Sequence, residues 1–192
     1  MRKLSLLALM GLFLLGATID DTQNMVVRVV CPNGQYGSGV SIKQGILTAA
    51  HVILDEKNRI FTGVQLETFS GGKYDCLITK VDVQKDLALL KCRYYLKRAS
   101  IAKKMPKVGD KIWLIGNGYG VRNGYKTGSV GAIQDPFIML DCRIMPGDSG
   151  GGTFNSDGEL VGINDAVQLE FGGPTGYGLS VSRDTIVDFL KD

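Results

Sequence analysis

Histidine, tryptophan and proline are scarce in this 192-residue sequence, which has one, one and five of them, and only four cysteines are present. One histidine cannot supply a ligand pair, and the wide cysteine spacing fits neither a zinc site nor a C-x-x-C redox pair. The phosphate-binding motif G-x-x-x-x-G-K-[ST] is missing, and no G-x-G-x-x-G follows a parallel strand. We therefore expect no metal ion and no small-molecule cofactor.

A strong charge of either sign is also lacking. The formal net charge is +3, and it falls by two to +1 if Arg2 and Lys3 leave with an N-terminal leader. No basic stripe follows, since Lys103, Lys104 and Lys107 are typical of a solvated linker. The charge pattern therefore argues against nucleic acid as a partner.

The longest apolar run lies at the N-terminus. Leu4–Ala17 spans 14 residues after the basic pair Arg2 and Lys3, which is short for a membrane span and right for the core of a signal peptide. A buried helix is disfavoured, because nothing polar gives the run a second face. We expect residues 1–24 to be a signal peptide with a short N-terminal segment, and the protein to be secreted or periplasmic. Residues 16–18 lack a clean A-x-A cleavage site, which leaves an uncleaved membrane anchor open.

Helical periodicity is nearly absent before the C-terminus, and short aliphatic and β-branched runs take its place. The first group of runs comprises Met25–Cys31, Gly39–Ile42, Ile60–Phe69, Tyr74–Val81 and Leu87–Cys92. The second group comprises Lys111–Ile115, Tyr125–Ile133, Phe137–Leu140, Thr153–Phe154, Glu159–Ile163 and Tyr177–Val181. Such runs, with 26 glycines at the bends, predict an all-β barrel or sandwich.

Two further segments complete the predicted architecture. The charged stretch Arg93–Asp110 is expected to be a crossover linker between the two groups. At the C-terminus Ser182 could cap a helix whose inner face carries Ile186, Val187 and Leu190. We therefore predict two β-barrels joined by a linker and closed by a C-terminal helix.

The cysteines favour disulfides. Cys31, Cys76, Cys92 and Cys142 make an even count in a chain expected to be exported, which favours two disulfides from three possible pairings. A hairpin folded about Gln84 would set Cys76 opposite Cys92, so we take this pair as a hypothesis. The alternative is that all four are small buried hydrophobic residues.

Ser149 lies in a loop suited to a nucleophile. A serine that attacks a carbonyl needs an exposed hydroxyl on a tight turn, with backbone N–H groups aimed at the developing oxyanion. The glycines in Pro146–Gly152 permit such a turn and let a substrate approach the backbone. An ordinary glycine-rich loop is the alternative for this segment alone.

His51 and Asp86 supply the partners that such a serine needs. His51 follows the apolar run that begins at Ile46, and Asp86 opens the strand Leu87–Cys92, with Asp82 as a nearby alternative. A carboxylate that accepts a hydrogen bond from the imidazole fixes its tautomer and stabilises the imidazolium. A lone histidine in the core and an aspartate in a turn are common, but the three contexts together predict a Ser-His-Asp triad.

In this order, the three contexts resemble the trypsin-like (chymotrypsin-fold) serine peptidases, and most of all their HtrA/Deg branch. The likeness covers roughly residues 25 to 190. It rests on Ser38–Val40, Ile46–Ile53, Asp86–Lys91, Val108–Asp110, Ile115–Asn117, Pro146–Gly152, Asp157–Asn164 and Gly176–Val181. The glycines at 116, 118 and 120 fall within a turn of the second barrel in this reading.

The resemblance implies the fold in more detail. Two six-stranded antiparallel β-barrels would pack side by side, with the triad in the cleft between them. The expected segments are an N-terminal part over 1–24, a first barrel over 25–97, a linker over 98–108, and a second barrel with the C-terminal helix over 109–192.

The resemblance also implies a serine endopeptidase that cuts polypeptides through an acyl-enzyme intermediate. The backbone N–H groups of Gly147 and Ser149 would form the oxyanion hole. The substrate backbone would pair, as an added strand, with the segment of Asn164, Asp165, Ala166 and Val167. The alternative is a trypsin-fold binding protein without catalysis. The sequence does not indicate an oligomeric state.

Two departures from the HtrA/Deg pattern concern regulation. We expect the PDZ module typical of that branch to be missing, because no second domain follows in this sequence. Asp148 stands where HtrA-like chains often carry asparagine; in trypsins this aspartate is held by an N-terminus that zymogen cleavage frees. We expect an enzyme that needs only leader removal, and a mature start within Met25–Val27 is the alternative.

Two other departures concern the site itself. Asp165 stands where relatives have a small hydroxyl residue, and if it faced Asp86 one of the two carboxyls would tend to stay protonated. Arg143, six residues before Ser149, would favour acidic P1 side chains. We instead expect Ile144 to dominate a small apolar pocket, as in the HtrA pattern.

Overall fold

The computed structural model describes residues 18–94, 96–170 and 173–191, with the backbone alone described at 166–170 and 173–175. The apolar core of the predicted signal peptide, Leu4–Ala17, lies outside the described residues. Among the helices of the described chain, none has the length and hydropathy needed to cross a bilayer.

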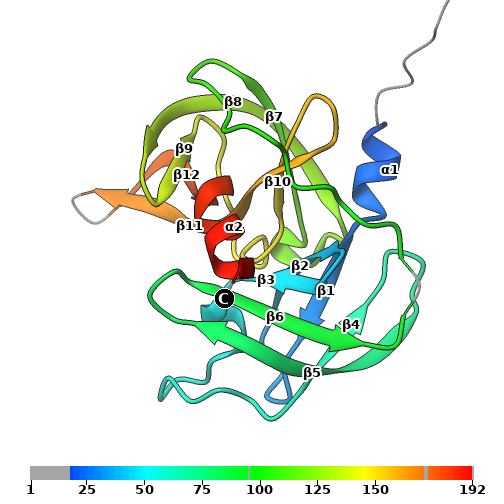
Figure 1. The fold of residues 1–192 in the computed structure, drawn as a ribbon. Helices are drawn as coiled ribbons and strands as arrows, with labels where there is room; N and C mark the ends of the chain where they lie inside the picture. The colour runs from blue at the N-terminus through cyan, green and yellow to red at the C-terminus, as the bar shows by residue number, and fades with distance from the viewer. Residues whose placement is uncertain (1–17, 95, 171–172, 192) are drawn as a thin grey trace, which may run out of the picture.

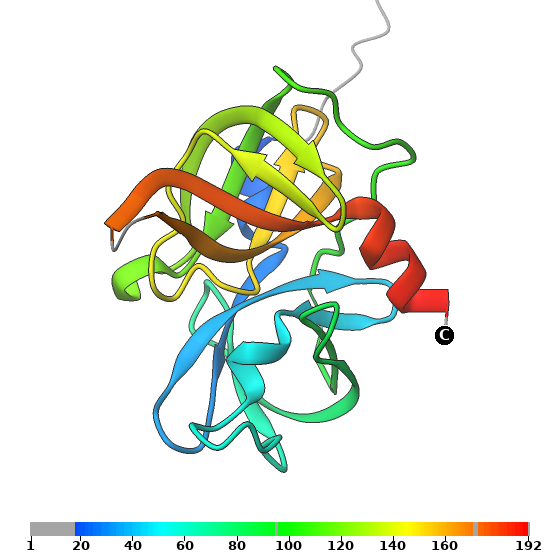
Figure 2. The same ribbon diagram turned by 90° about the vertical axis from the view of Figure 1, so that its left-hand side faces the viewer.

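Twelve strands of the described chain form two closed, six-stranded antiparallel barrels (Figure 1, Figure 2), which confirms the predicted fold class. The first barrel contains β1 (Val26–Val30), β2 (Tyr36–Ile42), β3 (Gly45–Thr48), β4 (Val64–Glu67), β5 (Lys73–Asp82) and β6 (Leu87–Cys92). The second contains β7 (Lys111–Gly116), β8 (Gly124–Gln134), β9 (Phe137–Leu140), β10 (Gly152–Asn155), β11 (Leu160–Glu170) and β12 (Gly173–Ser182). The strand orders are β1-β2-β3-β6-β5-β4 and β10-β11-β12-β9-β8-β7.

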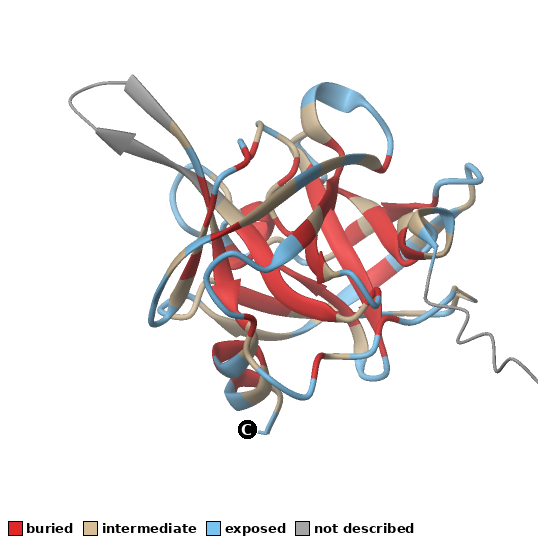
Figure 3. Ribbon diagram, turned by 90° about the horizontal axis from the view of Figure 1, so that it is seen from above, coloured by how far each residue is buried: buried red, intermediate tan, exposed pale blue. Residues whose placement is uncertain are grey.

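Aliphatic side chains fill both barrels, and Figure 3 shows the buried residues concentrated in their strands. Val27, Leu47, Leu66 and Leu90 are fully buried in the first barrel. The second barrel buries another aliphatic set, formed by Ile112, Leu114, Val130, Ile138, Leu140, Ile144 and Val161. Alternation of apolar and polar residues along strands closed into a barrel explains this division.

Two short helical turns follow strands near the junction of the barrels. The apolar run that contains His51 does not stay extended: β3 ends at Thr48, and the 3₁₀ turn η1 (Ala50–Ile53) follows. The turn η2 (Gly118–Gly120) follows β7 in the second barrel.

Helix α2 (Arg183–Lys191) closes the fold at the junction of the two barrels. The Ser182 hydroxyl accepts a hydrogen bond from the Thr185 N–H at 3.3 Å, in keeping with the predicted cap. The inner face differs from the prediction, because Phe189 is fully buried whereas Val187 is only half-buried. Lys80 of β5 lies 4.6 Å from the centre of the Phe189 ring, so the helix of the second half packs on the first barrel.

The short helix α1 (Ile19–Gln23) precedes β1 and docks on the second barrel. The Gln23 side-chain amide donates to the Asn123 carbonyl at 2.8 Å, and the Asn123 amide donates back to the Gln23 carbonyl at 2.7 Å. Thr22 within the helix is fully buried. Residues 18–24 are therefore packed against the folded domain.

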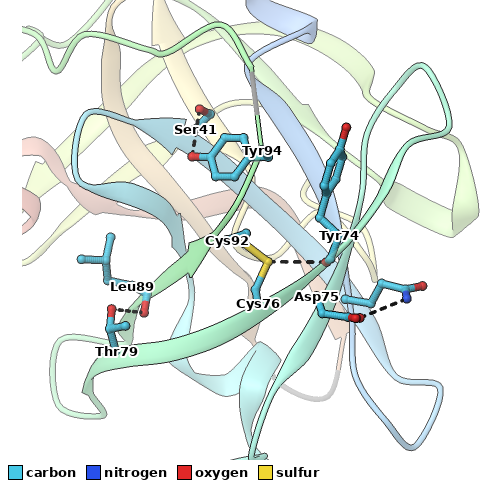
Figure 4. Close-up of a disulfide and its surroundings, with 9 residues drawn as sticks. Ser41, Tyr74, Asp75, Cys76, Thr79, Leu89, Cys92 and Tyr94 are labelled. Atoms are coloured by element: carbon cyan, nitrogen blue, oxygen red, sulfur yellow. Dashed lines mark hydrogen bonds between the residues drawn. A yellow bond between two sulfur atoms is a disulfide. The ribbon is translucent and has the colours of Figure 1, made fainter.

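One of the two predicted disulfides is present. Cys76 of β5 pairs with Cys92 of β6, with 4.4 Å between their Cα atoms, which confirms the hairpin hypothesis (Figure 4). The prediction of a second disulfide is wrong, because Cys31 and Cys142 are free and lie in the cores of different barrels. Burial raises the pKa of each free thiol to about 11, so both behave as small apolar residues.

We expect two thiols of the exported protein to react with iodoacetamide only after unfolding, and Cys76 and Cys92 to react only after reduction. A cross-link with a sequence separation of 16 residues should contribute about 3 kcal/mol to the free energy of unfolding. Urea unfolding of Cys76→Ser/Cys92→Ser measures this loss, with Cys31→Ala as the control for removing a thiol. Four reactive thiols, or none, in unreduced and unfolded protein would contradict the assignment.

Candidate active site

His51 and Asp86 are joined by two hydrogen bonds. The His51 backbone N–H donates to Asp86 Oδ1 at 2.9 Å, and Nδ1 of the ring lies 2.8 Å from Asp86 Oδ2. An ionised carboxylate can only accept, so this contact places the proton on Nδ1. Nε2 is then left as the basic nitrogen of the ring.

Asp86 is held by the turn that precedes β6. Its backbone has a φ of 49°, in the left-handed region that aspartate tolerates better than most residues. Its carbonyl accepts from the Ala50 N–H at 3.1 Å, beside the two bonds to His51. The turn η1 and the start of β6 therefore meet through Asp86, which fixes the position of the imidazole.

Ser149 lies on a turn that only glycines permit. Gly147 and Gly150, on either side, have φ values of +99° and +81°. A Cβ atom on Gly150 would lie 2.2 Å from the Ser38 carbonyl oxygen, and one on Gly147 would lie 2.6 Å from that of Asn117. The Ser149 hydroxyl donates to the Asp165 carbonyl at 2.8 Å.

Residues 147–150 form the turn that carries Ser149, called the serine turn below. Their backbone N–H groups fall into two sets. Those of Asp148 and Gly150 donate to the carbonyls of Met145 and Asn164, at 2.8 and 2.7 Å. Those of Gly147 and Ser149 make no hydrogen bond to another described residue. The two N–H groups predicted to form an oxyanion hole are therefore available to a ligand.

Ser38 and Asn117 connect this turn to the first barrel. The Ser38 N–H donates to the Ser149 carbonyl and its hydroxyl donates to the Gly147 carbonyl, both at 2.7 Å. The Asn117 backbone and side-chain N–H groups each donate to the Ser38 hydroxyl at 2.9 Å. The predicted site did not include these two residues; a serine within an apolar strand and an asparagine beside glycines were the available signals.

Asp165 faces the His51–Asp86 pair. Its Oδ1 lies 3.8 Å from His51 Nδ1, and its side chain is only 15% exposed. Burial raises the pKa of Asp165 to about 6, and the neighbouring charge of Asp86 acts in the same direction. Asp165 therefore faces Asp86, which was the condition stated for one of the two carboxyls to stay protonated.

Two effects compete at His51. Burial acts to lower its pKa, but the hydrogen bond and charge of Asp86 and the charge of Asp165 outweigh it, so the pKa is raised. Atoms of His51, Asp86 and Asp165 that could bind a cation lie within 4.8 Å of one another. His51 Nδ1 is already engaged in the contact with Asp86.

The residues predicted to bind substrate have different surroundings. Asn164 is fully buried and donates to the Ile115 carbonyl at 3.2 Å, so its side chain belongs to the interior of the barrel. The backbones of Ala166 and Val167 pair with β12. Ile144 is buried, whereas Arg143 is exposed. The assignment of these residues to substrate binding stays a prediction.

Comparison with known proteins shows the family. A model of the trypsin-like peptidase domain matches residues 37–163. The chain therefore belongs to the trypsin-like peptidases, and within them it is homologous to the DegP, DegQ and HtrA proteases, as the sequence motifs predicted.

Three relatives illustrate the similarity. The periplasmic pH-dependent serine endoprotease DegQ of Escherichia coli is 32% identical over 160 residues, which are 76% of this chain and 34% of DegQ. A probable periplasmic DegP-like serine endoprotease of Buchnera aphidicola is 32% identical over 174 residues, 81% of this chain and 36% of the relative. The crystal structure of the serine endoprotease from Yersinia pestis has a TM-score of 0.79 and 28% identity, covering 91% of this chain and 66% of that one. The chain spans about a third of the length of the two curated relatives.

We expect Asp165→Asn to stabilise the fold at pH 7.5 and to have little effect near pH 4. The pKa of Asp165 is raised from 3.8 to about 6, so its contribution to stability is present below pH 4 and is lost as the pH rises through 6. The difference at pH 7.5 should be about 3 kcal/mol in the free energy of unfolding, measured with urea at a series of pH values.

The same variant should lower the pKa of His51, because one of the charges that raises it is removed. His51 is the only histidine in the sequence, so NMR titration reports it without ambiguity. Asp157→Asn, in an exposed turn, is the control. An unchanged or higher pKa of His51 in Asp165→Asn would contradict the contact between these groups.

Proposed function

We propose that the chain is a serine endopeptidase in which Ser149 is the nucleophile and His51 the general base. Asp86 orients the His51 ring and stabilises its protonated form. The observation that carries the proposal is the pair of hydrogen bonds from His51 to Asp86, next to a serine on a glycine turn with two available N–H groups. The names of the relatives, which are serine endoproteases, support the reaction class.

The reaction begins with a rotation of the Ser149 hydroxyl away from the Asp165 carbonyl. His51 Nε2 takes the hydroxyl proton as Oγ attacks the carbonyl carbon of the scissile peptide bond. The imidazolium that forms is stabilised by Asp86, and the N–H groups of Gly147 and Ser149 donate to the developing oxyanion. His51 then gives the proton to the leaving amine. In the second half of the reaction His51 takes a proton from water as the water attacks the acyl group. His51 returns that proton to Ser149 Oγ as the acid product leaves.

Asp165 adds a second function to this arrangement. Above pH 6 its ionised carboxylate places another negative charge beside the imidazole, which favours the imidazolium formed in the transition state. Below pH 6 it is neutral and this contribution is lost. On the acid side, the dependence of activity on pH should therefore contain the titrations of both His51 and Asp165.

The substrates we propose are polypeptides outside the cytoplasm. The periplasmic relatives and the predicted signal peptide support a secreted or periplasmic location. The substrate backbone is proposed to lie along β11 at Asp165, Ala166 and Val167. The second candidate is a binding protein that retains the fold without catalysis. It is considered because the Ser149 hydroxyl donates its hydrogen bond to the Asp165 carbonyl and not to His51.

We expect a fluorophosphonate to form a single adduct on the purified mature protein and none on Ser149→Ala, as measured by intact mass. Loss of Ser149 or His51 should reduce turnover on the order of a million-fold. Ser156→Ala, which removes an exposed hydroxyl from a turn of the second barrel, is the matched control for the loss of a serine hydroxyl. Folded wild-type protein that forms no adduct would favour the binding protein.

We expect small aliphatic residues at P1 in a peptide-library profile. Ile144 is buried, and a Cβ atom on Gly178 would lie 2.8 Å from it, so the space beside β12 is apolar and narrow. Ile144→Ala should admit larger P1 side chains, and Arg143→Ala should leave the profile unchanged because Arg143 is exposed. A preference for acidic P1 residues that disappears in Arg143→Ala would reverse this assignment.

A further inference from the structure

The Asp148 carboxylate, next to Ser149, is buried and fully paired. Its side chain is 2% exposed. The Gly118 N–H donates to Oδ1 at 2.9 Å and the Met145 N–H donates to Oδ2 at 2.8 Å. Oδ2 also forms an ion pair with the ammonium group of Lys126. Because a buried charge is costly unless it is paired and hydrogen-bonded, these contacts determine where this carboxylate can lie.

The second barrel leaves room for this carboxylate in its backbone. A Cβ atom on Gly116 would lie 2.6 Å from Asp148 Oδ1, and one on Gly118 would lie 2.7 Å from it. These glycines belong to the end of β7 and to η2. The carboxylate therefore occupies a space that any larger residue at either position would fill.

The carboxylate is also part of the turn that carries Gly147. The Met145 N–H binds the Asp148 side chain, and the Asp148 N–H donates to the Met145 carbonyl at 2.8 Å. Gly147 lies between these two residues, and its N–H is an oxyanion donor in the proposed function. Displacement of the Asp148 side chain would therefore move the Gly147 N–H as well.

Lys126 supplies its charge from within the folded barrel. It lies on β8 opposite Leu114 of β7, and its side chain is 33% exposed. A cation in this position is present whenever the second barrel is folded, and it does not depend on where the chain begins.

The N-terminal part of the described chain is engaged elsewhere. Val26 and Val27 pair with Val40 and Gly39 of β2, and the Met25 N–H donates to the Thr22 carbonyl at 3.0 Å. A mature start at these residues would have to break these contacts before its amino group could reach Asp148, which already has a cation.

We propose that Lys126 is a positioning residue that holds Asp148, and through it the Gly147 N–H, in the geometry needed for oxyanion binding, so that the protein needs no newly cut N-terminus to become active. This proposal rests on the proposed function for its consequence in catalysis. The placement of the turn by Lys126 can be tested without catalysis.

Lys126→Met should slow fluorophosphonate labelling and lower kcat on the order of 100-fold, with a smaller change in KM, because an oxyanion donor is misplaced. Lys126→Arg should retain labelling within about tenfold, because it keeps the charge. Lys111→Met, an exposed lysine on the adjacent strand β7, should match the wild type. Thermal melts of all variants separate misplacement of the turn from unfolding.

A double-mutant cycle isolates the charge pair. In an Asp148→Asn background no buried charge needs a cation, so Lys126→Met should change the labelling rate less than threefold there. Protein that begins before residue 25 should label as fast as any shorter form. Equal losses from Lys126→Met in both backgrounds, or silent long forms that become active on cleavage at Val26, would overturn the proposal.

Hydrogen exchange of a peptide covering residues 145–150 tests the placement alone. Lys126→Met should exchange faster than the wild type in this peptide, and Lys126→Arg and Lys111→Met should not. A wild type that never labels while this pattern holds would reject the endopeptidase and keep the role of Lys126 in ordering the turn. Unchanged exchange in folded Lys126→Met would reject that role whatever the activity.

Discussion

The buried hydroxyl of Ser38 joins the two barrels at the point on which the whole site depends. It donates to the Gly147 carbonyl and accepts from the backbone N–H and from the side-chain amide of Asn117. The Ser38 backbone N–H donates to the Ser149 carbonyl. These bonds use the donor and both acceptor positions of the hydroxyl. Because buried polar networks are costly when partly satisfied, the serine turn of one barrel is set in a single position against the other barrel.

The junction of the two barrels also brings three aspartate side chains into one region of the protein. Asp86 comes from the first barrel, whereas Asp148 and Asp165 come from the second. Asp86 is hydrogen-bonded to His51, and Asp148 is paired with Lys126. Asp165 instead faces the carboxylate of Asp86, and its pKa is raised to about 6 by burial and by that neighbour. The arrangement costs stability at neutral pH and places negative charge where an imidazolium would form, which is common at catalytic sites.

Local patterns predicted two β-barrels and the residues of a candidate triad, whereas the six strands of each barrel came from the resemblance to the HtrA/Deg branch. The short β-branched runs predicted the barrels, and glycine contexts singled out Ser149. Contacts between distant strands were beyond such patterns: nothing near Lys126 in the sequence indicates that it meets Asp148. Pairing across a hairpin could be predicted for Cys76 and Cys92, because their separation follows from one turn, but the burial of the other two cysteines in separate barrels depends on the tertiary fold.

A crystal structure of the protein treated with a peptidyl phosphonate tests the central claim most directly. Our account predicts a bond from the Ser149 oxygen to phosphorus, with one phosphonate oxygen within hydrogen-bond distance of the N–H groups of both Gly147 and Ser149. The His51 ring should keep its bond to Asp86 and lie against the adduct. An unmodified Ser149 that still donates to the Asp165 carbonyl, in well-ordered protein exposed to excess reagent, would contradict the account.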